Sequence, residues 1–121
     1  MDTETFVDTM NEIMVAGVKG LVEAIEDPPG RKPSAGLLRV SAFYKKLSNE
    51  DRETFVTALG MAARGATGEF FCVLDGIMAF EDEHKGKLEL YYRVGDQSVL
   101  LNGRHGPMLD EHFRAIDTPW R

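Results

Sequence analysis

One apolar stripe, which keeps its helical period without a break from Phe55 to Ile77, constrains the fold of this chain more than any other feature. Its members recur every three or four residues and fall within about 120° of arc on an ideal helix. They are Phe55, Val56, Leu59, Ala62, Ala63, Ala66, Phe70, Val73, Leu74 and Ile77. A break in the helix would shift the stripe, so the pattern predicts one long helix over residues 49–80.

Several glycines lie inside that predicted helix, and each costs about 1 kcal/mol relative to alanine in a helix interior. All but Gly60 belong to a second face of mostly small residues, which recur every three or four positions. This face comprises Ala58, Met61, Gly65, Gly68, Cys72, Gly76 and Ala79. Small residues let another backbone approach closely. We therefore predict that the long helix is the buried central element and packs on an N-terminal helix through Gly65, Cys72 and Gly76.

Two further helices precede the long one. Residues 3–26 show the same period, Asp2 can cap the first turn, and a Pro-Pro pair forbids continuation. After a loop rich in proline and glycine, a second helix is predicted over residues 35–47. Ser48 and Asp51 then form the Ser-x-x-Asp pattern of a helix start, which places the beginning of the long helix.

The C-terminal third changes character, because the hydrophobic period falls from 3.6 to two after residue 86, which is typical of a strand. Gly95 and Asp96 form a two-residue turn, so the segment predicts a β-hairpin. The pairs expected from that turn are Tyr92 with Val99, Leu90 with Leu101 and Tyr91 with Leu100. A short helix follows from Pro107 to about Ala115.

The predicted fold class is therefore α+β and predominantly helical. It has a long central helix packed on an N-terminal helix, one β-hairpin and a short C-terminal helix. The length of 121 residues fits a single domain over residues 1–121.

Composition excludes several classes of protein. The net charge is −6, and the few basic residues form no dominant basic face, so we expect no nucleic-acid binding. The longest apolar run is interrupted by Asp75 and is too short to span about 30 Å of hydrocarbon, so we expect no membrane span. One cysteine and an acidic start without an export signal favour a soluble protein of the cytoplasm.

The candidates for chemistry lie between residues 69 and 86, in EFFCVLDGIMAFEDEHKG. Cys72 is a nucleophile only with a lowered pKa and a base, and the sequence provides a cue for neither, so a buried inert thiol is favoured. Asp75 lies beside the small face, where a carboxylate needs donors; a structural hydrogen bond is favoured over an acid or a ligand contact. Asp75, Cys72 and His84 are the candidate catalytic residues.

Metal and cofactor sites are not indicated. Glu81 and His84 have the Glu-x-x-His spacing of half a di-iron site, but the chain has no second pair. His105 and His112 lie seven residues apart, and surface histidines are much commoner than ligands at such spacing. No phosphate-binding, dinucleotide-binding or hydrolase motif is present either. We expect no metal and no cofactor.

A partner surface is predicted on the hairpin. Tyr91 and Leu100 share one face with Arg93, and the edges of an isolated hairpin are unpaired. We expect this face to bind a protein partner or a second copy in a homodimer. Trp120, near the end of the sequence, is a further candidate partner-binding residue, unless it docks onto the core. The alternative to a dimer is that Trp120 covers Tyr91 and leaves a monomer.

Two stretches carry a resemblance, FCVLDGIMAFED followed by GKLELYY over residues 71–92 and LDEHFRAI over residues 109–116. Together they resemble a group of small uncharacterised bacterial proteins. In that group a Val-Leu-Asp-Gly helix precedes an acidic turn, a strand and a terminal Leu-Asp-x-x-Phe helix. The resemblance implies a bacterial-type origin and this fold, and it carries over no activity and no catalytic residue.

Two functional hypotheses remain open. The first, which we favour, is a non-enzymatic protein-interaction module, immunity-like or regulatory. It rests on small size, acidic balance, missing catalytic motifs and the Tyr91 face of the hairpin. The second is a small enzyme or ligand-binding domain that uses Asp75 with a nearby histidine. A pocket beside Asp75 that contains a histidine would favour the second hypothesis, and a packed Asp75 would favour the first.

Overall fold

The computed structural model describes residues 1–78, 81, 83, 86–103 and 106–120. Within these residues the helices are α1 (Thr3–Glu26), α2 (Ala35–Lys45), α3 (Asn49–Leu74) and α4 (Leu109–Ala115). The strands β1 (Tyr91–Val94) and β2 (Gln97–Leu100) form one antiparallel hairpin. The predicted class, α+β and mainly helical, is confirmed.

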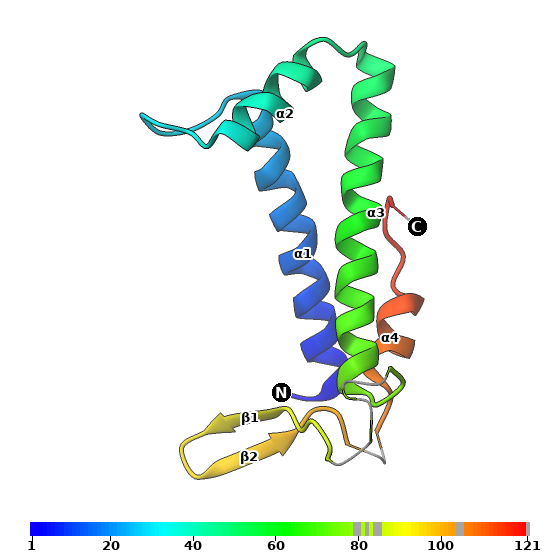
Figure 1. Ribbon diagram of the computed structural model, residues 1–121. Coiled ribbons are helices and arrows are strands. Elements are labelled where there is room, and N and C mark those ends of the chain that lie inside the picture. Colours follow the sequence, from blue (N-terminus) through cyan, green and yellow to red (C-terminus); the bar gives the residue numbers. More distant parts are fainter. Residues whose placement is uncertain (79–80, 82, 84–85, 104–105, 121) are drawn as a thin grey trace.

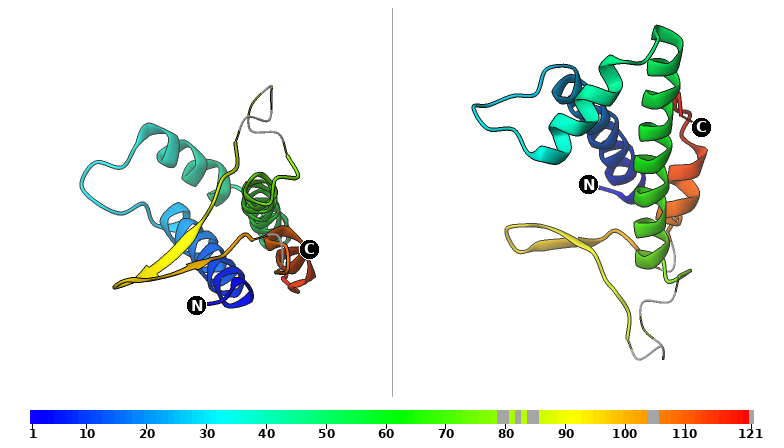
Figure 2. Two further views of the ribbon diagram at one scale, coloured as in Figure 1. Left: turned by 90° about the horizontal axis from the view of Figure 1, so that it is seen from below. Right: turned by 45° about the horizontal axis from the view of Figure 1, so that its top comes forward.

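The helices α1 and α3 form a V that is closed at one end and open at the other (Figure 1). At the closed end, the start of α1 meets the end of α3, while α2 lies at the open end. The helix α4 and the segment after it lie along α3, and the chain there runs opposite to α3. The hairpin lies beyond the closed end and extends sideways below α1 in Figure 1, and the right-hand view of Figure 2 shows the same placement.

Side-chain caps begin the first three helices. The Asp2 carboxylate accepts a hydrogen bond from the Thr5 N–H at 2.7 Å. The hydroxyl groups of Ser34 and Ser48 accept from the third residue after each of them, at 3.2 and 3.1 Å. These bonds satisfy N–H groups that have no partner within the helix. The predicted starts at residues 3, 35 and 49 are confirmed.

The end of α3 differs from the prediction, because the helix stops at Leu74 and residues 75–78 are not helical. Gly76 has a φ of 79°, a conformation that glycine adopts without steric cost. Its N–H donates to the Val73 carbonyl at 3.1 Å, and the Ile77 N–H donates to the Cys72 carbonyl at 2.9 Å. These two bonds form a Schellman motif, which ends a helix. Residues 79 and 80 of the predicted helix lie outside the described residues.

The core lies at the closed end of the V. Its fully buried members are Val7 of α1, Phe71 of α3, and Leu109 and Phe113 of α4. The Phe71 and Phe113 rings meet edge to face, with centroids 5.2 Å apart. Phe6 of α1 packs on the other side of Phe71 at 6.2 Å in a similar geometry. The core therefore depends on α4 as much as on the two long helices.

The small face of α3 packs on a different partner from the one predicted. Gly65 and Gly76 are exposed, and a Cβ atom added at either would meet nothing within 4 Å. Close approach occurs at Gly68, where an added Cβ would lie 3.6 Å from Asp110 and Phe113, and at Gly60, where it would overlap the Trp120 ring. The prediction that α1 packs through Gly65, Cys72 and Gly76 is wrong, because α4 and the segment after it occupy this side.

The apolar stripe of α3 is also less buried than predicted. Phe70 is 62% exposed and Ile77 is 53% exposed, and Ala62 and Ala66 are exposed as well. The buried residues of α3 are Gly60, Phe71 and Cys72. The other six residues of the stripe are half-buried, and Phe55 packs on Phe43 and Tyr44 of α2. The monomer therefore covers only part of the most regular apolar pattern of the sequence.

The two roles of glycine in α3 give a matched test. We expect Gly60→Ala to destabilise the protein by about 1–2 kcal/mol, because overlap with Trp120 outweighs the better helix propensity of alanine. We expect Gly65→Ala to be neutral or stabilising by up to about 1 kcal/mol, because its Cβ would meet open space. Urea unfolding measures both changes. Equal effects of the two variants would refute the close contact at Gly60.

Candidate functional site

Asp75 caps the short helix α4 from a distance in sequence. Its two carboxylate oxygens accept hydrogen bonds from the backbone N–H groups of Leu109, at 3.0 Å, and Asp110, at 2.8 Å. The residue at the N-cap position of α4, Met108, has no side-chain cap bond of its own. A carboxylate at a helix N-terminus interacts favourably with the helix dipole. Asp75 is therefore a structural residue that joins the end of α3 to the start of α4.

Arg64 binds the other end of α4, and sequence reasoning missed it. Its guanidinium group donates to the carbonyl oxygens of Arg114 and Ile116, each at 3.2 Å. It also donates to the Thr118 hydroxyl at 3.3 Å and lies over the Phe113 ring, 5.1 Å from its centroid. A signal was present in the sequence, because Arg64 is the only charged residue between Glu53 and Glu69.

Cys72 and Asp110 are buried side by side, and the exposed Arg114 of α4 contacts both of them. Arg114 forms an i,i+4 ion pair with the buried Asp110 and donates a weak hydrogen bond to the Cys72 sulfur at 4.0 Å. Burial raises the pKa of the Cys72 thiol, and the hydrogen bond and negative charge of Asp110 raise it further, against a lowering by Arg114. A raised pKa keeps the sulfur protonated at neutral pH, whereas a nucleophile needs the thiolate. The geometry favours the inert thiol.

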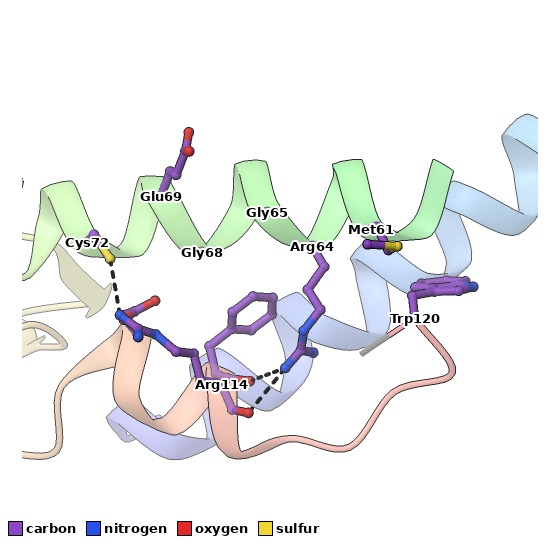
Figure 3. Close-up of a pocket in the computed structure, with 10 residues that line it drawn as sticks. Met61, Arg64, Gly65, Gly68, Glu69, Cys72, Arg114 and Trp120 are labelled. Atoms are coloured by element: carbon purple, nitrogen blue, oxygen red, sulfur yellow. Dashed lines mark hydrogen bonds and ion pairs between the residues drawn. The ribbon is translucent and has the colours of Figure 1, made fainter. Parts of the chain in front are cut away.

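A shallow groove of about 450 Å³ runs beside this cluster, between α3 and the C-terminal segment (Figure 3). It is lined by Met61, Arg64, Gly65, Gly68, Glu69, Cys72, Asp110, Phe113, Arg114 and Trp120. None of these residues is a histidine, and the guanidinium groups of Arg64 and Arg114 bind protein atoms. The groove therefore lacks the histidine that the enzymatic hypothesis requires beside its acid.

The histidines do not join the other candidates. His84 and His105 lie outside the described residues. His112 is on α4, and its Nε2 atom lies 2.9 Å from a carboxylate oxygen of Asp8 on α1, which links the two helices. Among the residues that the structure describes, no three histidine, cysteine, aspartate or glutamate side chains come together as metal ligands do.

The hairpin has the predicted register and a fixed base. Tyr91 pairs with Leu100, Tyr92 with Val99, and the Leu101 N–H donates to the Leu90 carbonyl at 2.8 Å. The Asn102 amide joins the base to the end of α3, since its nitrogen donates to the Leu74 carbonyl at 2.7 Å and its oxygen accepts from the Leu90 N–H at 2.8 Å. The Thr3 hydroxyl of α1 donates to the Leu101 carbonyl at 2.8 Å.

Beyond this base the hairpin is uncovered. All eight residues of β1 and β2 are exposed, and Tyr91 is 53% exposed. The sheet has two strands, and neither outer edge pairs with another strand of the described chain. Arg93 lies on the same face as Tyr91, where its Nε donates to the Ser98 hydroxyl at 3.1 Å. This face, which also includes Leu100, is the predicted partner surface.

Trp120 does not cover that surface. Its side chain is 8% exposed and lies on Gly60 of α3, at the opposite end of α4 from the hairpin. In this position Trp120 is inaccessible to a partner. The alternative in which it covers Tyr91 is wrong, because Gly60 provides a flat surface on α3 that accepts the indole ring.

Comparisons with protein-family models, with curated proteins and with solved structures find no match to this chain. They give no support to the resemblance seen in residues 71–92 and 109–116. No helix in the described part of the chain is both long and apolar enough to cross a membrane.

The cap on α4 can be tested by removing its acceptor. We expect Asp75→Ala to lower the free energy of unfolding by about 1–2 kcal/mol, because two backbone N–H groups lose their partner. Amide hydrogen exchange should accelerate at Leu109 and Asp110. The exposed Glu69 is a control on the same helix, and Glu69→Ala should change stability by less than about 0.5 kcal/mol. Unchanged exchange in Asp75→Ala would contradict the cap.

The buried, protonated thiol of Cys72 is expected to react slowly with thiol reagents. In the native protein we expect its reaction with a thiol reagent at pH 8 to be at least about 100-fold slower than in the unfolded chain. Fast native labelling would restore the nucleophile hypothesis.

The raised pKa also predicts a pH dependence. The unfolded thiol ionises near pH 8.5 while the folded thiol stays protonated. The stabilisation is complete below that pH and is lost as the pH rises through the pKa of the folded state. Urea unfolding between pH 7 and pH 10 should show this decline, and Cys72→Ala should lack this part of it.

Proposed function

We propose that this chain is a non-enzymatic protein-interaction module whose working surface is the hairpin. The observation that carries the proposal is that both strands are exposed along their whole length in a sheet of two strands. A two-stranded hairpin is marginally stable in water by itself. Another chain that covered it would therefore stabilise it as well as bind to it.

The chemistry of the hairpin suits a protein partner. Tyr91, Arg93 and Leu100 share one face, and tyrosine and arginine are the residue types most enriched at the centres of protein interfaces. The free edges offer unpaired N–H and C=O groups, to which an extended segment of a partner can add as a third strand. The bonds of Asn102 hold the base in place, so less order has to be gained on binding.

The enzymatic hypothesis has less support. Both oxygens of Asp75 are engaged by the backbone of α4, and the raised pKa of Cys72 holds that residue as a thiol. This is the packed Asp75 that favours an interaction protein. The protonated, unpaired Cys72 also suits a reducing compartment, so we place the module in the cytoplasm. Its net charge of −6 favours a partner that is not a nucleic acid.

Photo-crosslinking in cells tests the proposal without knowledge of the partner. A benzophenone amino acid placed at Tyr91 keeps an aromatic side chain at the centre of the surface. We expect one discrete adduct, whose second protein is identified by mass spectrometry. The same probe at Lys19, an exposed residue of α1 away from the hairpin, is the control and should give none.

The Arg93→Glu variant sharpens this test, because it reverses a charge on the same face at an exposed position. It should reduce the Tyr91 adduct without changing the helical content seen by circular dichroism. No discrete adduct at Tyr91, or an equal adduct at Lys19, would contradict the hairpin as the working surface.

A further inference from the structure

We propose a second interface: the side of α1 and α3 that faces away from α4 binds a second copy of this chain in a two-fold dimer. We call this side the outer face; its residues include Ile13 and Leu21 of α1 and Leu59, Ala66, Phe70 and Val73 of α3. The inference goes beyond the proposed function, since it concerns a different surface and a named occupant.

The first argument is that the apolar pattern of α3 predicts more burial than the monomer provides. A helical face that stays apolar from Phe55 to Ile77 is the pattern of a helix that is buried along that side. Within the monomer α2 packs on its Phe55 end, but Ala62, Ala66 and Phe70 are exposed, Phe70 by 62%. On the neighbouring helix α1, Ile13 is 57% exposed. Isolated exposed apolar residues are common on protein surfaces, but a continuous apolar stripe along a helix marks an interaction site.

Helical geometry places the two exposed stripes on one side of the molecule. The helix α4 contacts α3 through Arg64 and Asp75, and Phe70 lies about 120–140° around α3 from both. On α1, α4 contacts Asp8, and Ile13 lies about 140° around that helix from it. Both helices therefore turn apolar side chains to the side that α4 leaves open.

The second argument is area. The chain exposes 8752 Å², whereas a compact monomer of 13.5 kDa exposes about 6,500 Å². This excess of about 2,200 Å² belongs to the whole chain, and the exposed hairpin contributes to it. It is still larger than the area of about 800 Å² that each partner buries in an interface of standard size. A second copy of this chain can cover a surface of this size, because it presents the same area in return.

The third argument is that the α3 stripe matches itself. From Leu59 through Ala62 and Ala66 to Phe70, the side chains are large at both ends and small in the middle. Phe55, at the start of the stripe, packs on Phe43 and Tyr44 of α2 and lies outside this contact. When two copies cross in antiparallel directions near residue 64, Ala62 meets Ala66 of the partner subunit, and Leu59 meets Phe70 of the partner subunit. Alanines at the crossing let the two helices approach closely, and the antiparallel direction suits their dipoles.

The electrostatics of the outer face agree with this occupant. The stripe carries no charged residue between Phe55 and Ile77, so two copies of a protein with net charge −6 meet there without bringing like charges together. The hairpin, beyond the closed end of the V, stays free for another chain.

Ala66→Glu tests the interface at its centre. Light scattering should give twice the 13.5 kDa mass of one chain for the wild type, and the mass of one chain for the variant. The dissociation constant should rise by at least about 100-fold, because burial of an unpaired carboxylate is costly. Phe70→Glu is a second variant with the same expected result. Circular dichroism should show retained helix in both, since both residues are exposed in the isolated chain.

Two controls separate this inference from others. Thr57→Glu adds the same charge to an exposed position about 180° around α3 from Ala66, and it should leave the dimer intact. Tyr91→Glu should also leave the mass unchanged, whatever the crosslinking at the hairpin shows. A monomeric wild type, an unchanged mass in Ala66→Glu, or loss of the dimer in Tyr91→Glu would overturn the outer face as the interface.

Discussion

The contact of Asp75 with the start of α4, together with the contact of Arg64 with its end, is the constraint on which the rest of this structure depends. A helix of seven residues does not hold its shape alone in water. Here an acid of α3 meets its positive end and a base of α3 meets its negative end. With α4 held in this way, Leu109 and Phe113 are placed against Phe71 and complete the core.

The helix α4 and the segment after it pack on the side of α3 that carries Gly60, Gly68 and Cys72. The two sides of the α1–α3 pair therefore differ in how far the chain itself covers them. One side is closed by polar bonds and aromatic packing within the chain. The other side carries α2 at its Phe55 end and leaves Ala62, Ala66 and Phe70 exposed in the monomer. The exposed apolar surface of the molecule thus lies at the outer face and at the hairpin, the two surfaces for which we propose partners.

The sequence was sufficient for the elements that depend on neighbours along the chain. The caps at Asp2 and Ser48, the start of the second helix at residue 35, the hairpin register and the fold class follow from local pattern, and they are confirmed. The end of α3 was misplaced because an apolar period continues past Gly76, whereas the backbone turns there. The partner of the small face and the role of Arg64 could not be predicted, since helical period shows which residues share a face and not which element that face meets. A structural hydrogen bond was expected for Asp75, and the structure has such bonds. Their donors, backbone N–H groups 34 and 35 residues away along the chain, could not be predicted.

The separation of Asp75 from Leu109 along the chain also affects how the protein folds. To bring Leu109 to Asp75, the chain must close a loop of 34 residues that includes the whole hairpin, at an entropic cost of about 3 kcal/mol that grows slowly with loop length. The contact of Phe6 with Phe71, which joins α1 to α3, spans a longer stretch of chain still. Both contacts that build the core therefore close long loops, and long-range contacts of this kind slow folding. Until α4 docks, the small face of α3 and its apolar face are both in water; once it has docked, only the side with Ala66 and Phe70 is left for a second chain to reach.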